Sequence, residues 1–270
     1  MKLYLTGQTG LIGRNIMEFM PTNIQLTEIP EEADYIIHAA GYGQPAKFMA
    51  DEIATISVNT TALIELLKKL KPSGKFLCLS TSEIYSGAKS PYKETDIGTT
   101  SPIHPRACYI ESKRCGEAIC MVYRRLGYNV KIARLSLAYG GAKKGDSRVL
   151  NQFIESAVLK NEIKLLDKGE AKRTYLYVED AVRILWDILI KGVQPIYNVG
   201  GISKTTIAEL ANKIGELTGA KVIFGDKGLD GAPDNVCMDI SLILKEFGER
   251  EFISLDEGLK KTIARQYAHG

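Results

Sequence analysis

Three glycines near the N-terminus constrain the fold more than any other feature of this sequence. Gly7, Gly10 and Gly13 follow the apolar run of residues 2–5 and precede a helix-like segment over residues 14–20. In a strand–turn–helix unit such glycines permit a tight turn, let the backbone approach a diphosphate and let the helix pack on the strand, while the helix N-terminus binds phosphate. The pattern predicts a dinucleotide site, with a plain strand-to-helix turn as the alternative. The expected cofactor contacts here are Gly7, Thr9, Gly10, Leu11 and Ile12.

The stretch after this unit is unusually short for a dinucleotide-binding fold. Pro21 ends the helix, residues 23–27 are the only candidate second strand, and the next strand begins by Tyr35. Such folds normally place an acidic residue at the end of the second strand, where it holds the adenosine ribose. Glu28 is the candidate for that role, and the acidic residues over 31–34 fit a solvated turn equally well. We therefore expect the adenosine end of the cofactor to be held loosely.

Apolar runs and helical patterns alternate along the rest of the chain. This alternation predicts an α/β fold, a Rossmann-type doubly wound parallel sheet with a small C-terminal α/β substrate-binding domain. Residues 1–160 are expected to form the dinucleotide-binding domain and residues 161–270 mainly the substrate-binding domain, with 174–200 returning to the first sheet. Two long helices are expected, over residues 54–70 and 107–126.

Two polar segments suggest proton-transfer chemistry. Thr81 and Glu83 follow the buried run of residues 75–79, and ligands bind at the carboxyl ends of strands in open α/β sheets. Tyr109 and Lys113 are four residues apart, which places them on one face of a helix. An ammonium group favours the phenolate, so Lys113 is expected to lower the pKa of Tyr109. The alternative for Glu83 is a structural role, as a turn cap or the partner of a lysine.

Composition argues against several other classes of protein. The net charge is only +3 and the sequence has no basic arm, so nucleic acid is not an expected partner. No apolar stretch reaches the length of a membrane span, and the N-terminus lacks the layout of a signal peptide. Five cysteines without a Cys-x-x-Cys pair fit reduced thiols in the cytoplasm, and three unpaired histidines argue against a metal site.

Landmarks spread over nearly the whole chain carry a family resemblance. They are Thr6 to Gly13, His38-Ala39-Ala40, Asn59, Thr81, Tyr109 with Lys113, Arg134, Arg173 with Asp180, Tyr197-Asn198-Val199-Gly200 and Asp256-Glu257-Gly258-Leu259. In this order they resemble the extended short-chain dehydrogenase/reductase family that modifies nucleotide sugars. The resemblance implies NAD as cofactor, with NADP possible, a nucleotide-sugar substrate, and a homodimer formed through the helices over 54–70 and 107–126.

The resemblance also implies roles for individual residues. Tyr109 is the base that takes a proton from a sugar hydroxyl, Lys113 holds the nicotinamide ribose, and Thr81 orients the substrate oxygen. Ala39, Ala40 and Asn59 join Tyr109 and Lys113 in binding the cofactor. The expected substrate contacts are Ser82, Arg106, Arg148 and Arg173, the last gripping the diphosphate.

The subgroup within the family is less sharply defined. Residues 102–109, with Lys113-Arg114 and residues 146–149, are similar to UDP-glucuronate decarboxylase, and Thr81-Ser82-Glu83 is similar both to that enzyme and to sugar 4,6-dehydratases. There the glutamate acts on the C5 proton next to a 4-keto group, so Glu83 favours dehydration or decarboxylation. Ser136-Leu137 stands where an asparagine is usual, and residues 233–238 lack the usual arginine.

Three hypotheses follow for function. The first is an NAD-dependent nucleotide-sugar enzyme that oxidises C4 transiently and then dehydrates, decarboxylates or epimerises its substrate. The second is a non-catalytic relative that binds cofactor or nucleotide sugar. The third is a keto-sugar reductase that consumes NADPH, with Arg14 next to the adenosine 2′-phosphate.

Overall fold

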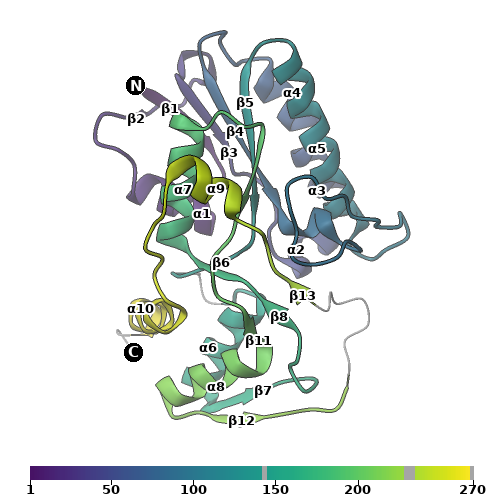
Figure 1. The fold of residues 1–270 in the computed structure, drawn as a ribbon, viewed down its shortest axis with the longest axis vertical. Helices are drawn as coiled ribbons and strands as arrows, with labels where there is room; N and C mark the ends of the chain where they lie inside the picture. Colours follow the sequence, from purple (N-terminus) through teal and green to yellow (C-terminus); the bar gives the residue numbers. More distant parts are fainter. Residues whose placement is uncertain (142–144, 228–234, 268–270) are drawn as a thin grey trace.

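A six-stranded parallel sheet forms the centre of the computed structural model, which describes residues 1–141, 145–227 and 235–267 (Figure 1). In spatial order its strands are β10 (Ile196–Val199), β5 (Asn129–Leu135), β4 (Lys75–Thr81), β3 (Tyr35–His38), β1 (Lys2–Thr6) and β2 (Gln25–Leu26). Every neighbouring pair runs parallel. The predicted Rossmann-type sheet is therefore confirmed, and its second strand, expected over residues 23–27, has only the two residues of β2.

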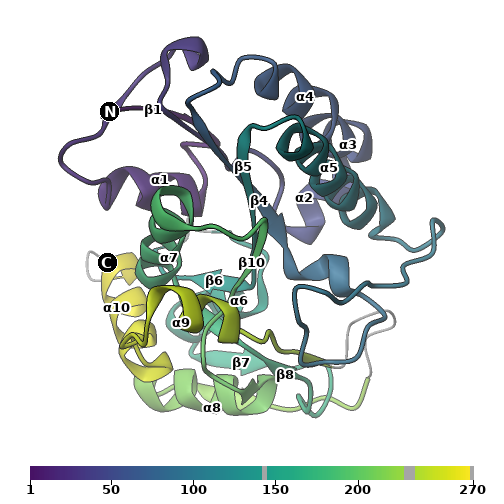
Figure 2. The ribbon, with the colours of Figure 1, turned by 45° about the horizontal axis from the view of Figure 1, so that its top comes forward.

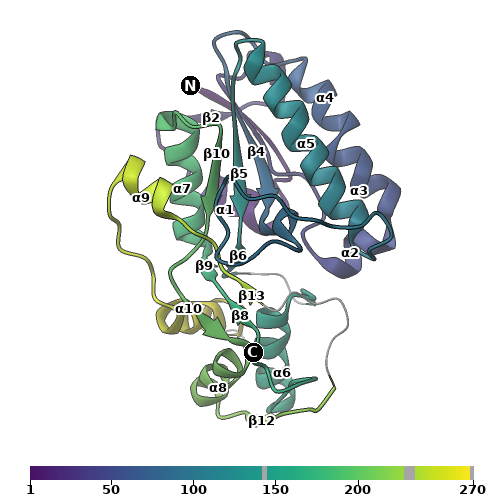
Figure 3. The same ribbon diagram turned by 45° about the vertical axis from the view of Figure 1, so that its right-hand side comes forward.

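Helices cover both faces of this sheet (Figures 2 and 3). On one face lie α1 (Leu11–Glu18), α7 (Val178–Lys191) and the short α9 (Ser241–Phe247). On the other lie α3 (Glu52–Asn59), α4 (Thr61–Leu67) and α5 (Ala107–Arg125). Neighbouring strand residues pack into different cores, since Ile37 faces α7 whereas Ile36 faces α4. Both faces are thus buried, as a parallel sheet requires.

The helix predicted over residues 54–70 is wrong in one respect, because it is interrupted at Thr60. That residue has φ −126° and ψ −79°, which ends α3 and starts α4. Its hydroxyl donates to the carbonyl oxygen of Ile56 at 2.7 Å, and the hydroxyl of Thr61 donates to that of Ser57 at 3.0 Å. Threonine hydroxyls that bond to the preceding turn compete with helical geometry, and two in succession favour a break.

A second, smaller layer lies beyond the carboxyl ends of the main strands (Figure 1). Its helices are α6 (Val149–Lys160), α8 (Ile207–Thr218) and α10 (Leu255–Tyr267). Its strands are β7 (Glu162–Lys164) with β12 (Lys221–Ile223), and β8 (Lys172–Arg173) between β11 (Thr205–Thr206) and β13 (Asn235–Val236). Two further strands, β6 (Leu137–Tyr139) and β9 (Tyr175–Tyr177), pair between the two layers. A capping box of Thr206 and Glu209 begins α8.

The small layer has its own apolar core, in which α6, α8 and α10 pack together. The division of the chain at residue 160 stays a prediction, and α6, which precedes residue 160, belongs to this second core. Between residues 174 and 200, α7 packs on the main sheet and β10 is one of its strands. No helix among the described residues is long and apolar enough to cross a bilayer.

Candidate active site

The glycine turn lies at the carboxyl end of β1, where backbone segments approach closely. Gly7 has φ +73°, and a Cβ there would lie 2.5 Å from the carbonyl oxygen of Ala39. A Cβ on Gly13 would lie 2.1 Å from the carbonyl oxygen of Gly7, so the helix can reach the turn only with glycine at this position. Gly10 is the N-cap of α1 and provides no side-chain cap. The first N–H groups of α1 are therefore suited to a diphosphate, and the turn fits a dinucleotide.

His38 fastens this turn to the neighbouring strand. Its Nδ1 lies 3.0 Å from Thr6 Oγ1, which also accepts a hydrogen bond from the Ala40 N–H at 3.1 Å. Its Nε2 lies 3.1 Å from the carbonyl oxygen of Val58. Burial, assisted by the charge of Lys113, lowers the pKa of His38 to about 4, so the ring is neutral at pH 7. His38 therefore supports the site as a core residue and does not titrate near neutral pH.

Tyr109, Lys113 and Thr81 meet at the carboxyl end of β4. Tyr109 and Lys113 are buried on the inner face of α5, and Thr81 is near enough to Tyr109 to lower the pKa of its phenol. The Lys113 ammonium donates to the carbonyl oxygen of Leu79 at 2.8 Å. A Cβ on Gly41 would lie 3.6 Å from Lys113 Nζ and 3.5 Å from Asn59 Oδ1. The predicted cofactor residues Asn59 and Lys113 thus converge on one point of the loop after β3.

The predicted direction of the Tyr109 pKa is not met. Burial raises the pKa of Tyr109 above its usual value, and the charge of Glu83 raises it further. The Thr81 side chain and the charges of Arg106 and Arg148 lower it, but burial is the largest effect. Burial likewise lowers the pKa of Lys113. Four-residue spacing identified the pair correctly but could not reveal how deeply α5 is packed.

Glu83 and Arg106 form an ion pair beside Tyr109. Glu83 lies in the 3₁₀ turn η2 (Ser82–Tyr85), and Arg106 Nη2 donates to its Oε1. Glu83 therefore pairs with an arginine, where a lysine was the alternative considered. Burial raises the pKa of Glu83, and the charge of Arg106 opposes that shift. Glu83 Oε2 and Arg106 Nε are buried and have no hydrogen-bond partner among the described residues.

Phe48, in α2 (Pro45–Ala50), contacts both Arg106 of this ion pair and the ring of Tyr109. The sequence-based predictions did not include it. Its ring stacks on the Tyr109 ring with centroids 4.5 Å apart and an interplanar angle of 3°. The guanidinium carbon of Arg106 lies 5.4 Å from the centroid of the Phe48 ring. The phenylalanine is fully buried. It therefore forms a layer between the base candidate Tyr109 and the cation that holds Glu83.

The remaining predicted substrate residues are less closely grouped. Ser82 is buried in η2. Arg148 is held by Asp146, with Nε 2.9 Å from Oδ1, and its charge affects the pKa of Tyr109. Arg173 stands in β8 of the small layer and donates to the carbonyl oxygen of Lys172 at 2.8 Å. The structure thus brings Arg106 and Arg148 toward Tyr109, and places Arg173 in the layer that faces the carboxyl edge (Figure 1).

Comparison with known proteins identifies the family. Residues 20–200 match the NAD dependent epimerase/dehydratase family. The chain belongs to that family. This confirms the resemblance drawn from the sequence and supports NAD as the cofactor.

Curated relatives point to one group of sugar-modifying enzymes. UDP-glucuronic acid decarboxylase 1 from Xenopus tropicalis is 32% identical over 238 residues, which are 86% of this chain and 56% of that protein. UDP-glucuronic acid decarboxylase 6 from Arabidopsis thaliana is 30% identical over 235 residues, 84% of this chain and 68% of that protein. The chain spans about half the length of the first of these relatives.

Solved structures with the same fold match all or nearly all of the chain. The structure titled RMD from Pseudomonas aeruginosa complexed with NADPH has a TM-score of 0.86 at 21% identity and covers 100% of this chain and 99% of its own. UDP-glucuronic acid 4-epimerase from Bacillus cereus, in complex with UDP-glucuronic acid and NAD, has a TM-score of 0.83 at 19% identity, with 98% of each chain covered. Both agree with the Rossmann-type architecture.

A buried polar network behind Lys113 was not predicted. Arg134 forms two hydrogen bonds with Glu117, Nε to Oε1 at 3.0 Å and Nη2 to Oε2 at 2.8 Å. Its Nη1 donates to the hydroxyl of Tyr85 at 2.7 Å, which in turn donates to Asn198 Oδ1 at 2.7 Å. Ser80 Oγ donates to Glu117 Oε1 at 2.5 Å. Arg134 and Asn198 were among the family landmarks, but their link through Glu117 and Tyr85 was not foreseen; Glu117 follows Lys113 by four residues on the same helix face.

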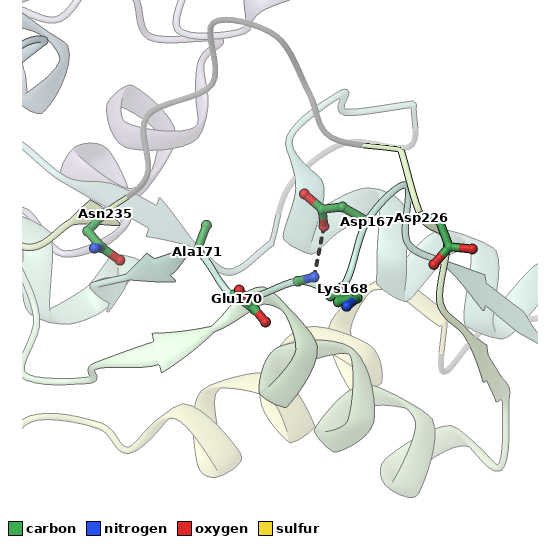
Figure 4. A pocket seen from close by; sticks show the side chains of 7 residues that line it. Asp167, Lys168, Glu170, Ala171, Asp226 and Asn235 are labelled. Carbon is green, nitrogen blue, oxygen red and sulfur yellow. Dashed lines mark hydrogen bonds between the residues drawn. The ribbon is translucent and has the colours of Figure 1, made fainter.

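A separate pocket of the protein lies away from the predicted catalytic and cofactor residues (Figure 4). Its lining residues are Asp167, Lys168, Gly169, Glu170, Ala171, Asp226 and Asn235. A hydrogen bond of 2.8 Å from the Gly169 N–H to Asp167 Oδ1 shapes its turn. None of the predicted catalytic or cofactor residues lines it.

Proposed function

We propose that the protein is an NAD-dependent nucleotide-sugar enzyme that oxidises C4 of its substrate transiently. The observation that carries this proposal is the meeting of Thr81, Tyr109 and Lys113 at the carboxyl end of β4, beside the glycine turn of β1. Open α/β sheets bind cofactor and substrate at this edge. A non-catalytic binder would gain nothing from a phenol buried beside Thr81 and Lys113.

Tyr109 is proposed to remove the proton from the C4 hydroxyl, with Thr81 orienting the same oxygen. When bound, NAD supplies the hydride acceptor. Lys113, whose ammonium is fixed by the Leu79 carbonyl oxygen, and Asn59 hold the nicotinamide ribose on this side of the sheet. The ammonium then faces the developing phenolate and stabilises it, which offsets the cost that burial imposes on that charge.

Glu83 is proposed to act after C4 is oxidised. A 4-keto group acidifies the C5 proton, and a carboxylate whose pKa is raised by burial accepts that proton more readily than an exposed one. Arg106 holds Glu83 in place, and its charge opposes the rise that burial causes in the pKa of Glu83. This arrangement favours dehydration or decarboxylation over epimerisation, and the relatives named as decarboxylases support a substrate related to UDP-glucuronic acid.

A panel of nucleotide sugars tests the proposal directly. The purified protein is incubated with NAD and each sugar, and products are separated by mass into loss of CO2, loss of water and epimers of unchanged mass. We expect one sugar to give one of the first two products, and Glu83→Gln to accumulate a 4-keto intermediate. Tight binding of a sugar nucleotide without turnover would support the non-catalytic alternative, and steady consumption of NADPH with a keto sugar would support the reductase.

A homodimer is proposed as the assembly. Ile53 and Ile56 on α3 and Val122 on α5 are 77%, 41% and 44% exposed, on helices that form the outer layer of the molecule (Figure 3). Burying these apolar side chains against the same surface of a second copy removes them from water. Light scattering of the native protein is expected to give twice the chain mass, and a double substitution of Ile53 and Val122 by glutamate a single chain mass.

A further inference from the structure

The main sheet ends at β2, where doubly wound dinucleotide folds continue. In the usual strand order a further strand lies outside the second one and walls the adenosine site. Here β2 has two residues, a single turn η1 (Pro30–Glu32) follows, and β3 begins at Tyr35. The structure describes all of residues 1–141, and within them no strand pairs with the outer edge of β2. Among the described residues, therefore, no strand outside β2 walls the adenosine site.

The register of β2 removes the usual ribose ligand from its place. β2 pairs only with Lys2 and Leu3, whereas β1 continues through Tyr4 and Leu5 to Thr6. At about 3.3 Å per residue, β2 stops roughly 10 Å before the level of the glycine turn. Glu28, two residues beyond β2, is exposed at this shortened end. The chain stays beside β1 as far as Thr27, whose N–H donates to the carbonyl oxygen of Leu3 at 2.9 Å. The Glu28 side chain makes no hydrogen bond or ion pair among the described residues, so nothing holds it as the ligand of the ribose 2′-hydroxyl.

The other acidic residues between β2 and β3 form ion pairs at the amino ends of the strands, away from the glycine turn. Glu32 pairs with Lys2, and Asp34 accepts the Lys2 backbone N–H at 2.7 Å and pairs with Lys71 at 2.7 Å. Glu31 pairs with Lys69 at 3.4 Å. Because β1 begins at Lys2, these contacts lie at the amino ends of the strands, far from the diphosphate turn.

The cation considered for a 2′-phosphate is also engaged elsewhere. Arg14 Nη2 donates to the carbonyl oxygen of Gly141 at 3.1 Å, and its Nε donates to that of Gly10 at 3.4 Å. Both bonds hold the guanidinium over the start of α1. Because the Arg14 guanidinium is engaged in these bonds, it does not favour NADP. Because Glu28 is not held as a ribose ligand, it does not favour NAD.

We propose that the protein holds its dinucleotide through the diphosphate and the nicotinamide ribose and does not discriminate at the adenosine 2′ position. NAD and NADP then bind with similar affinities, and either can occupy the site. This inference rests on the proposed function only in requiring that a dinucleotide binds at the glycine turn.

Direct binding measurements test this inference without any turnover. NADH and NADPH are titrated into the purified protein and followed by nicotinamide fluorescence, with calorimetry of NAD and NADP as a second readout. We expect the two dissociation constants to differ by less than about tenfold, since no charged hydrogen bond distinguishes them. Glu28→Gln is expected to change each dissociation constant by less than about threefold. The matched control Glu31→Gln, at the amino ends of the strands, is expected to have an equally small effect.

Two results would overturn the inference alone. One is a preference of about tenfold or more for either dinucleotide, and the other is a loss of NADH affinity of about threefold or more in Glu28→Gln but not in Glu31→Gln. Failure of both dinucleotides to bind would overturn the inference and the proposed function together. The two failures are therefore distinguishable in one experiment.

Discussion

His38→Gln tests how the carboxyl edge of the sheet depends on a neutral imidazole. In the native protein the pKa of His38 is lowered from 6.5 to about 4, chiefly by burial. The unfolded chain therefore takes up a proton near pH 6.5, whereas the folded protein resists it until about pH 4. Stability from this residue is complete above pH 6.5 and is lost as the pH falls.

The magnitude follows from the difference between the two pKa values. At about 1.4 kcal/mol for each pH unit, the full loss below pH 4 is about 3 kcal/mol, and between pH 7 and 5 it is about 2 kcal/mol. Glutamine keeps polar atoms near Thr6 and Val58 but does not titrate. We expect His38→Gln to be less stable than the native protein at pH 7, by about 1 kcal/mol for each hydrogen bond it fails to remake.

Urea unfolding at pH 7 and pH 5 measures this directly. From pH 7 to pH 5 the free energy of unfolding should decrease less in His38→Gln than in the native protein. The two decreases should differ by about 2 kcal/mol. Parallel losses in the native protein and His38→Gln would refute the reasoning, because they would mean that His38 does not resist protonation.

Three further substitutions test other parts of the structure. Glu117→Gln leaves the buried guanidinium of Arg134 without its carboxylate, and urea unfolding should show a loss of about 3–5 kcal/mol. Phe48→Ala removes the ring that stacks on Tyr109; it should cost about 3–5 kcal/mol of stability and shift the pH profile of kcat, whereas an unmoved profile would assign Phe48 a purely structural role. Gly13→Ala places a Cβ 2.1 Å from a backbone oxygen of the turn, so calorimetry should detect no dinucleotide binding, and native affinity would contradict the assigned site.

Local patterns in the sequence predicted the parts of the site that depend on neighbours along the chain. The glycine spacing identified the turn, and the four-residue spacing identified Tyr109 and Lys113 as one face of α5. The shortness of the stretch between the first helix and β3 was also visible in the sequence, because Pro21 and Tyr35 are so close together.

Contacts between distant segments account for what the sequence did not reveal. Phe48 reaches Tyr109 from a different helix, and Arg106 reaches Glu83 across 23 positions of the chain. The upward shift of the Tyr109 pKa depends on burial by several elements at once, which spacing within α5 does not encode. The break at Thr60 reflects competition between side-chain and backbone hydrogen bonds, which apolar periodicity does not record.

Tyr109→Phe tests the central claim most directly, because it removes one oxygen and keeps the ring that stacks on Phe48. With the nucleotide sugar that the native enzyme converts, kcat/KM should fall by about 10²–10⁴, the usual contribution of a positioned acid–base group. NADH, titrated into the same preparation, should still bind, because the glycine turn and Lys113 are unchanged. Unchanged kcat/KM in Tyr109→Phe would contradict the claim that this phenol removes the C4 hydroxyl proton.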